Sequence, residues 1–269
     1  MILQGILEQG LIYSLVVMAL FISSRVIRFD DMTVEGSFGI GGALTAAGLL
    51  MGLPPWLMLP VVCAAGGASG LLTGLLHSRC GMSPLISGVC VTTALFSCAL
   101  LLAGSNLSLT ATIFTGLSPL ILLLPLVVGL LLFLRWLLTT EAGLLLWATG
   151  ESPQMVRDLS KRPETLRWMA LALANSLTAL AGSLWVQWAG FFSITANIGT
   201  LVIGLAGLFL AELVSRRMGF ALLIGALAYQ ALFAGTLLLG LPPVWNNLIK
   251  AALIVLVIQF KKGEQRCFI

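Results

Sequence analysis

The segment Thr139–Arg167, TTEAGLLLWATGESPQMVRDLSKRPETLR, is a polar island of 29 residues near the middle of a strongly apolar chain. It carries four acidic and four basic side chains, in a protein with only 10 Asp and Glu and 14 Lys and Arg. The island separates a first apolar half, residues 1–138, from a second half, residues 168–269. We expect residues 1–269 to form a single transmembrane domain, with the island (139–167) exposed at one membrane surface.

The composition of the chain indicates that it is dissolved in a lipid bilayer. Hydrophobic residues make up 59% of the sequence, charged residues 9%, and the mean hydropathy is +1.08, which leaves too little polar surface for a soluble globule. The apolar runs are long and continuous, as in helices of about 20 residues, and do not alternate as in membrane barrels. We therefore expect an all-α polytopic membrane protein, whose net charge of +4 reflects its orientation and not nucleic-acid binding.

Nine apolar segments are long enough to be candidate transmembrane helices. They run over Gln4–Ser24, Thr33–Leu50, Pro54–Leu76, Ser83–Ala103, Phe114–Leu138, Pro163–Trp188, Ala196–Ser215, Met218–Leu239 and Val244–Phe260. Spans one to four and six to nine are separated by an odd number of spans, so the two groups enter the membrane in opposite senses. The order of the spans is therefore compatible with an inverted repeat.

The distribution of basic residues predicts the orientation of the chain. Thirteen of the 14 Lys and Arg residues lie in or beside alternate links between the spans, and the intervening links have none. Basic loops remain on the cytoplasmic side of a membrane. The N-terminus is therefore expected outside, the C-terminus inside, and the polar island in the cytoplasm.

Three charged residues, Glu35, Glu212 and Lys250, fall inside the expected spans. A charge at the centre of a membrane helix costs at least about 2.5–3.5 kcal/mol on insertion scales, so each side chain should face protein or water. Two interpretations remain open. Lys250 pairs with one of the two acids as a structural contact, or the three groups take part in a proton or ion relay.

The second expected span has an unusual start. Residues Asp30–Gly42, DDMTVEGSFGIGG, combine acids, hydroxyls and four glycines. Asp31 or Thr33 can cap the helix by accepting from free backbone N–H groups, and the glycines allow close approach of backbone or ligand. The seventh span starts similarly, at Asn197–Thr200. Two interrupted segments at corresponding places indicate a pathway at the membrane midplane.

The candidate substrate pathway combines these polar and flexible positions. Its residues are Thr33, Glu35, Gly36, Ser37, Phe38, Asn197, Thr200, Glu212 and Lys250. The alternative is ordinary tight packing, which glycines in membrane helices commonly serve. Packing is the better explanation for the glycines spaced by four in the third span, Gly66, Gly70 and Gly74.

Motifs of enzymes and metal sites are missing from the sequence. It contains no G-x-x-x-x-G-K-[ST] phosphate loop, no H-E-x-x-H and no nucleophile elbow. We expect no catalytic residues, so that any ATP and Mg²⁺ would bind another subunit. His77 with Cys80 offers only two metal ligands, and the five cysteines follow no ligand spacing. No metal or cofactor is therefore expected on this chain.

One stretch resembles a known family of membrane proteins. Residues Phe29–Phe38, FDDMTVEGSF, are similar to the D-L-T-V-E-G-S-F signature of bacterial ABC-importer permeases in the branched-chain amino-acid and ribose permease superfamily, closest to its tryptophan/tyrosine-type group. The likeness extends through Glu141–Gly182 and Leu205–Glu212. The chain departs from the pattern at Met32, where the family has Leu, and at Ala211, where it has Gly. Both departures leave the choice of solute open.

The resemblance implies a permease subunit that moves a small solute, such as an amino acid, across the bacterial inner membrane by alternating access. It also implies three partners: a cytoplasmic ATP-binding subunit, a second permease subunit expected to be identical, and an extracytoplasmic substrate-binding protein. The island would seat in a groove of the ATPase, with a corner at Gly150 and Pro153. The expected coupling residues are Glu141, Gly143, Leu145, Trp147, Gly150, Glu151, Pro153, Arg157 and Asp158.

Two other classes of function remain compatible with the sequence. A secondary transporter or channel would use Glu35, Glu212 and Lys250 for ion coupling without an ATPase, and a membrane scaffold would transport nothing. An ATPase that purifies with the chain in stoichiometric amount would distinguish an importer subunit from both. Few polar groups line the expected pathway, which favours a small, partly apolar solute without identifying it.

Overall fold

The structure, a computed structural model, is a bundle of helices and describes residues 2–109, 112–114, 118–214, 218–238, 252 and 255. Its elements in chain order are α1 (Ile2–Leu20), the π-helix η1 (Phe21–Val26), α2 (Thr33–Leu50), α3 (Pro55–Cys80), α4 (Pro84–Ala103), β1 (Asn106–Ser108), α5 (Pro119–Thr139), α6 (Glu141–Glu151), α7 (Pro153–Asp158), α8 (Pro163–Ala189), β2 (Phe191–Ser193), the 3-10 helix η2 (Ile194–Asn197), α9 (Thr200–Val214) and α10 (Met218–Leu238). The expected ninth span and its Lys250 lie outside the described residues, apart from Ala252 and Val255.

Eight of the nine expected spans coincide with helices, namely α1, α2, α3, α4, α5, α8, α9 and α10. Within the described residues, five segments are long and apolar enough to cross a membrane: Leu3–Val26, Pro55–Cys80, Pro84–Ala103, Pro119–Thr139 and Pro163–Ala189. The helix α2 has 18 residues, and α9 is a shorter apolar helix of 15. The chain therefore has the helices of a multi-pass membrane protein.

Two of the expected spans begin later than predicted, by four or more residues. The fifth span begins at Pro119 and not at Phe114, because proline suits the first position of a helix, where an N–H group has no partner. The seventh begins at Thr200 and not at Ala196. Gly199, with a positive φ of 88°, stands immediately before it and interrupts the helical path.

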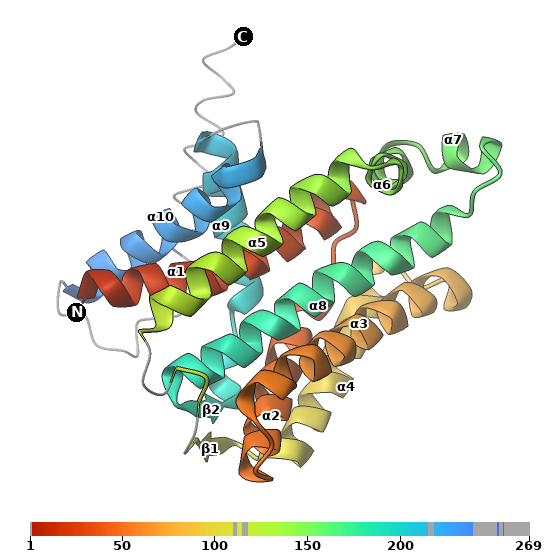
Figure 1. Cartoon of the computed structure of the whole chain (residues 1–269). Coiled ribbons are helices and arrows are strands. Elements are labelled where there is room, and N and C mark those ends of the chain that lie inside the picture. Colours follow the sequence, from red (N-terminus) through yellow and green to blue (C-terminus); the bar gives the residue numbers. More distant parts are fainter. Residues whose placement is uncertain are drawn as a thin grey trace.

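A short antiparallel sheet modifies the expected all-α fold. Strands β1 and β2 pair with Leu107 opposite Phe192. Both strands lie in links that the basic residues assign to the same side of the membrane, Gly104–Ile113 and Ala189–Thr195. Strands of three residues have no periodicity to detect, and they form here because two loops meet and pair their backbone groups. Figure 1 shows this sheet at the end of the bundle opposite α6 and α7.

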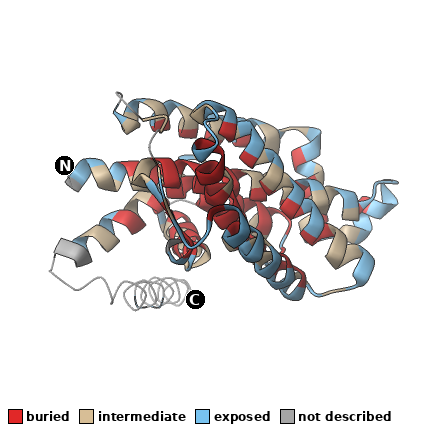
Figure 2. Cartoon of the chain, turned by 90° about the horizontal axis from the view of Figure 1, so that it is seen from below, coloured by how far each residue is buried: buried red, intermediate tan, exposed pale blue. Residues whose placement is uncertain are grey.

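Helices α1 and α8 lie side by side inside the bundle (Figure 1). The helix α8 also packs against α3 and α2, while α1 packs against α9, α10 and α5. Figure 2 shows that buried residues gather along these central helices and that exposed residues follow the outer ones. Since α4 and α5 are apolar and only 22% of each span is buried, their outer faces suit lipid or another apolar surface.

Glycines allow α8 to approach its neighbours closely. A Cβ atom at Gly66 or Gly70 of α3 would collide with the backbone of α8, and one at Gly74 would collide with a side chain of α8. The prediction that these three glycines serve packing is confirmed. On the other side, a Cβ at Gly182 of α8 would collide with the carbonyl group of Phe38 in α2. Backbones this close bring the polar side chains of α2, α3 and α8 within hydrogen-bonding distance.

Candidate functional site

Buried polar side chains form a ladder between α2, α3 and α8. Asn175 of α8 donates from Nδ2 to Oδ2 of Asp31 over 2.7 Å, and its Oδ1 accepts from Ser37 Oγ over 2.7 Å. The Ser37 hydroxyl also lies 2.7 Å from the hydroxyl of Ser69 in α3. All four side chains are buried. Because polar groups in an apolar interior need partners, this polar ladder determines which faces of the three helices meet.

Asp31 organises the start of α2. Its Oδ1 accepts from the N–H group of Thr33 over 2.9 Å, so Asp31 satisfies one free donor of the first turn, as predicted, although Met32 occupies the cap position. The Thr33 hydroxyl faces α3, 2.7 Å from the hydroxyl of Thr73. Thr33 and Ser37, both expected on the pathway, are therefore enclosed by contacts between helices.

The helix α2 starts deep inside the bundle. Asn175 follows Pro163 by 12 residues and precedes Ala189 by 14, so it lies near the middle of α8, about 18 Å from its start at 1.5 Å per residue. Ser37 contacts Asn175, which places the first turns of α2 at a similar depth. The segment 27–32 must therefore run into the fold before α2 begins.

The start of α9 meets the start of α2. Glu35 Oε1 accepts a hydrogen bond of 2.6 Å from the N–H group of Gly199, immediately before the first residue of α9. The free N–H groups and the positive end of the helix dipole stabilise a carboxylate at such a position. The two interrupted segments expected to correspond, at the starts of the second and seventh spans, are thus in direct contact.

A cavity of about 170 Å³ lies beside this contact. It is lined by Glu35, Gly36 and Gly39 of α2, by Thr92, Phe96 and Ala99 of α4, and by Ile194, Asn197 and Ile198. Asn197 is 4% exposed, yet neither its Nδ2 nor its Oδ1 has a hydrogen-bond partner among the described residues. We call this cavity the Glu35–Asn197 pocket. It combines a carboxylate and an unpaired amide with apolar walls.

Glu212, also expected on the pathway, lies elsewhere in the fold. It follows Thr200 by 12 residues, about 18 Å along α9, and forms an ion pair with Arg25 of η1. Its other expected partner, Lys250, is outside the described residues. Glu35 and Glu212 are therefore engaged separately, at opposite ends of the same helix.

Phe38 and Thr200 make structural contacts next to the pocket. The ring of Phe38 is stacked on that of Tyr13, with centroids 6.1 Å apart. The Thr200 hydroxyl donates to the backbone carbonyl of Asn197 over 2.8 Å and so holds the turn that carries the unpaired amide. Of the expected pathway residues, the structure brings Glu35, Gly36 and Asn197 together around one cavity.

The polar island folds into two short helices, α6 and α7. Thr140 and Ser152 cap them, each by accepting from a backbone N–H group of the first turn. The corner between the helices lies at Ser152, between Gly150 and Pro153, the two residues expected to form it. Gly150 lies in the last turn of α6, where a Cβ would collide with the carbonyl group of Val26.

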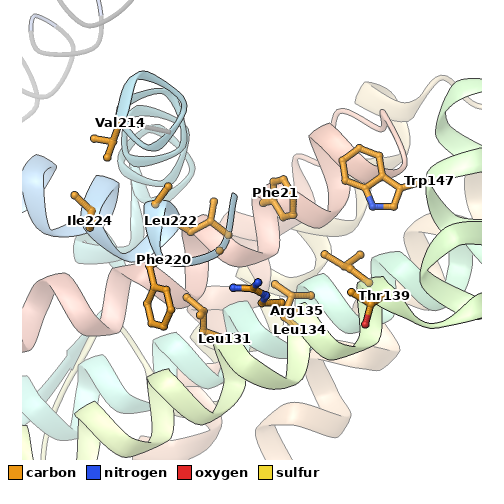
Figure 3. A pocket seen from close by; sticks show the side chains of 13 residues that line it. Phe21, Leu131, Leu134, Arg135, Thr139, Trp147, Val214, Phe220, Leu222 and Ile224 are labelled. Carbon is orange, nitrogen blue, oxygen red and sulfur yellow. The ribbon is translucent and has the colours of Figure 1, made fainter. Parts of the chain in front are cut away.

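One face of α6 is turned towards the bundle. Trp147 packs against Phe21 with ring centroids 6.1 Å apart, and Figure 3 shows both at one end of a groove of about 610 Å³. Leu145 is half-buried. Trp147 and Leu145, both expected to contact the ATPase, are thus partly covered by the bundle, because an amphipathic helix on a surface turns its bulkiest apolar side chain inward. The apolar side chains that are exposed are Leu144 at 61%, Met155 at 57% and Leu159 at 56%.

The remaining coupling candidates lie at the exposed end of the bundle. Arg157 and Glu164 form an ion pair of 2.8 Å, and Glu151 lies 3.6 Å from Arg28. Exposed pairs of this kind stabilise a fold by no more than about 1 kcal/mol, so these charges remain available to a partner. Gly143 is buried against the end of α5, while Glu141 and Asp158 are exposed.

Among the residues of the site that were not predicted, Asn175 and Thr92 make polar contacts with the start of α2. Asn175 is a polar residue in the centre of an apolar span, which is a signal that the sequence contained. Thr92 lines the Glu35–Asn197 pocket and donates to the Met32 carbonyl over 2.8 Å; its spacing does not mark it, because Thr in a helix often bonds its own backbone. Within the described ranges, no group of three or more His, Cys, Asp and Glu could hold a metal ion.

Comparisons with known proteins cover almost the whole chain. Residues 2–258 match the family described as "Branched-chain amino acid transport system / permease component". The chain is 30% identical over 260 residues to the tyrosine transport system permease protein of Clostridioides difficile (strain R20291), covering 93% of this chain and 88% of that protein. It is 29% identical over 230 residues to the autoinducer 2 import system permease protein LsrC of Escherichia coli (strain K12 / DH10B). That match covers 82% of this chain and 62% of LsrC. No solved structure matches the chain.

Proposed function

Because this chain belongs to the family of branched-chain amino acid transport system permease components, we propose that it is the permease subunit of an ATP-driven importer in a bacterial inner membrane. It carries a small solute, an amino acid or a similar metabolite, into the cytoplasm by alternating access. Similar permeases are named for transport of tyrosine and import of autoinducer 2. These differ in chemistry, so the family alone does not identify the solute.

The proposed topology has nine spans, an outer N-terminus, an inner C-terminus and an inverted repeat. The contact between Glu35 and Gly199 supports the repeat. The helices α2 and α9 are the second helices of their respective halves, and both begin inside the bundle. Interrupted helices that meet near the midplane are typical of transporters built from inverted repeats.

The position of α6 and α7 is the observation that carries the proposal. The helix α6 packs on α5, η1 and α8, and α7 packs on α8, so the island contacts both halves of the chain. Closure of an ATPase against these helices would move α8 and η1 together, and with them the polar ladder at the start of α2. The exposed Leu144, Met155 and Leu159 provide the apolar surface that seats in the ATPase.

The partners follow from this assignment. ATP and Mg²⁺ bind to the separate ATPase subunit, and an extracytoplasmic substrate-binding protein delivers the solute. A second, identical permease subunit completes the pathway. The exposed apolar faces of α4 and α5 leave room for both lipid and this second copy.

Co-purification with the ATPase tests the coupling assignment. The double variant L144D/M155D changes two exposed side chains, so it should insert and fold normally. The amount of ATPase that co-purifies with it should fall at least about tenfold. The matched control L50D/M51D places the same two charges on exposed residues at the end of α2, and it should keep the ATPase. A complex that survives L144D/M155D would contradict the proposal.

The alternative of a secondary transporter or channel makes a different prediction. Its coupling groups would be Glu35, Glu212 and Lys250, two of which are engaged by Gly199 and Arg25. Solute uptake should stop when the phosphate-loop lysine of the partner ATPase is replaced. Uptake that continues in that variant would favour the alternative.

A further inference from the structure

Asn197 carries polar atoms that the chain leaves without a partner. Of the four buried side-chain nitrogen and oxygen atoms without a hydrogen bond among the described residues, two belong to Asn197. Leaving both ends of an amide unpaired in a buried site is unfavourable. Because the amide borders the Glu35–Asn197 pocket, a molecule in that pocket could satisfy it.

The glycines of α2 shape the pocket around this amide. A Cβ at Gly39 would lie 3.2 Å from Asn197 Nδ2, and a Cβ at Gly36 would lie 2.8 Å from the Cα of Thr92. Phe96, which also lines the pocket, is exposed, so the pocket reaches the surface of the bundle there. Its volume of about 170 Å³ suits a molecule with a few non-hydrogen atoms, at roughly 30 Å³ for each water-sized group.

The charges near the pocket favour a cation over an anion. The starts of α2 and α9 meet here, and a carboxylate already accepts a hydrogen bond at each. Asp31 accepts from the N–H group of Thr33 at the start of α2, and Glu35 accepts from the N–H group of Gly199 at the start of α9. These carboxylates occupy the N–H groups that would otherwise attract an anionic ligand. The residues that line the pocket include no Lys or Arg. A ligand whose only charge is a carboxylate would therefore be repelled, whereas a ligand with an ammonium group would gain a charge partner in Glu35.

We propose that the Glu35–Asn197 pocket binds a small amine. The ammonium group pairs with Glu35, a second polar group such as a hydroxyl bonds with the Asn197 amide, and an apolar body packs between Phe96 and Ile198. This inference rests on the proposed function, because it takes the pocket as a binding site on the solute pathway, and it narrows the solute to a molecule with a cationic amine.

Two protonated amines that share an apolar tail test the proposal. Isobutylamine has only the amine, and valinol (2-amino-3-methylbutan-1-ol) adds a hydroxyl. Equilibrium binding is measured on the full chain in lipid nanodiscs, alone and with its ATPase, with isobutanol and isovalerate as neutral and anionic analogues. We expect saturable binding of both amines, at least about tenfold tighter than either analogue.

Two variants separate the roles of the two residues. E35Q keeps an oxygen that accepts from the Gly199 N–H group but loses the charge, so both amines should bind at least about tenfold more weakly. N197L removes the amide at similar volume and should weaken valinol alone. Because N197L also removes two unpaired polar atoms, the melting temperature of this variant without ligand should equal or exceed that of the wild type. The matched control is E8Q, at a buried carboxylate that accepts from Trp188 over 2.7 Å, and it should bind both amines normally.

Several outcomes would overturn the proposal. Equal affinity of E35Q and the wild type for isobutylamine would remove Glu35 as the counter-ion, and tight binding of isovalerate would reverse the inferred charge. An N197L variant that is less stable without ligand would make Asn197 a structural residue. The proposed function fails separately: if the chain binds amines but no ATPase, the importer assignment falls, and if it binds the ATPase but no amine, only this site falls.

Discussion

Asn175 and Asp31 are 144 positions apart in the sequence and are joined by a hydrogen bond of 2.7 Å inside the bundle. Asp31 precedes α2, and Asn175 lies in the middle of α8. The same amide accepts from Ser37 in the second turn of α2. One side chain of α8 therefore holds both the entry to α2 and its first turns at the depth where the Glu35–Asn197 pocket forms.

Replacing Asn175 by Ala should destabilise the fold strongly. The change leaves the Asp31 carboxylate without one of its donors and the Ser37 hydroxyl without an acceptor, both in a buried site, so we expect a loss of about 2–4 kcal/mol in the free energy of unfolding. The measurement is denaturant unfolding of the purified chain in detergent. The neighbouring S176A loses only a bond to the carbonyl of Cys63 and should lose about 1 kcal/mol. Equal losses would show that the ladder does not hold α2.

Gly70 should not tolerate a methyl group. In G70A the new Cβ would collide with the backbone of Leu171, which can yield only if α3 and α8 separate, so we expect a loss of about 1–3 kcal/mol. In G129A, on α5, the Cβ would meet nothing within 4 Å. That variant should be neutral or gain up to about 1 kcal/mol from its higher helix propensity. Thermal unfolding of the two proteins compares them, and a stable G70A would contradict the close packing of α3 on α8.

Arg25 and Glu212 should be coupled only moderately. Their ion pair joins η1 to the last part of α9, and the Arg25 side chain is 37% exposed, so solvent screens the interaction. A double-mutant cycle with R25A, E212A and the double variant should give a coupling of about 0.5–1 kcal/mol in the free energy of unfolding, and this value should fall at high salt. Strict additivity would indicate that the pair contributes nothing.

Trp147 and Leu144 should affect different properties although they are three residues apart. W147A removes the ring that packs on Phe21 and should lower the unfolding free energy by about 1–3 kcal/mol. L144A changes an exposed side chain and should stay within about 0.5 kcal/mol of the wild type, while weakening co-purification of the ATPase. Thermal unfolding and pull-down of the same preparations distinguish the two effects. The opposite pattern would mean that α6 is turned the other way in the complex.

The pathway residues illustrate how far local sequence leads. The polar, glycine-rich start of the second span and the break at Asn197–Thr200 could both be recognised, because polar groups and glycines stand out in an apolar run. The contact between Glu35 and Gly199 could not, because it joins residues 164 positions apart. The spacing of the residues also does not indicate that Glu212 pairs with Arg25. The sequence contains 14 Lys and Arg residues, and only the fold selects one of them as the partner.

By itself, the sequence determined that this protein lies in a membrane, where most of its helices run, and that residues 139–167 form a polar helical connection between two apolar halves. Those properties depend on composition and on the length of apolar runs, which are local. The tertiary structure decided which face of each helix is turned inward. That rotation depends on close backbone packing at Gly70 and Gly182 and on pairing of buried polar groups across helices. It is therefore what turns Trp147 towards Phe21, leaves Leu144 exposed and places the unpaired amide of Asn197 beside Glu35.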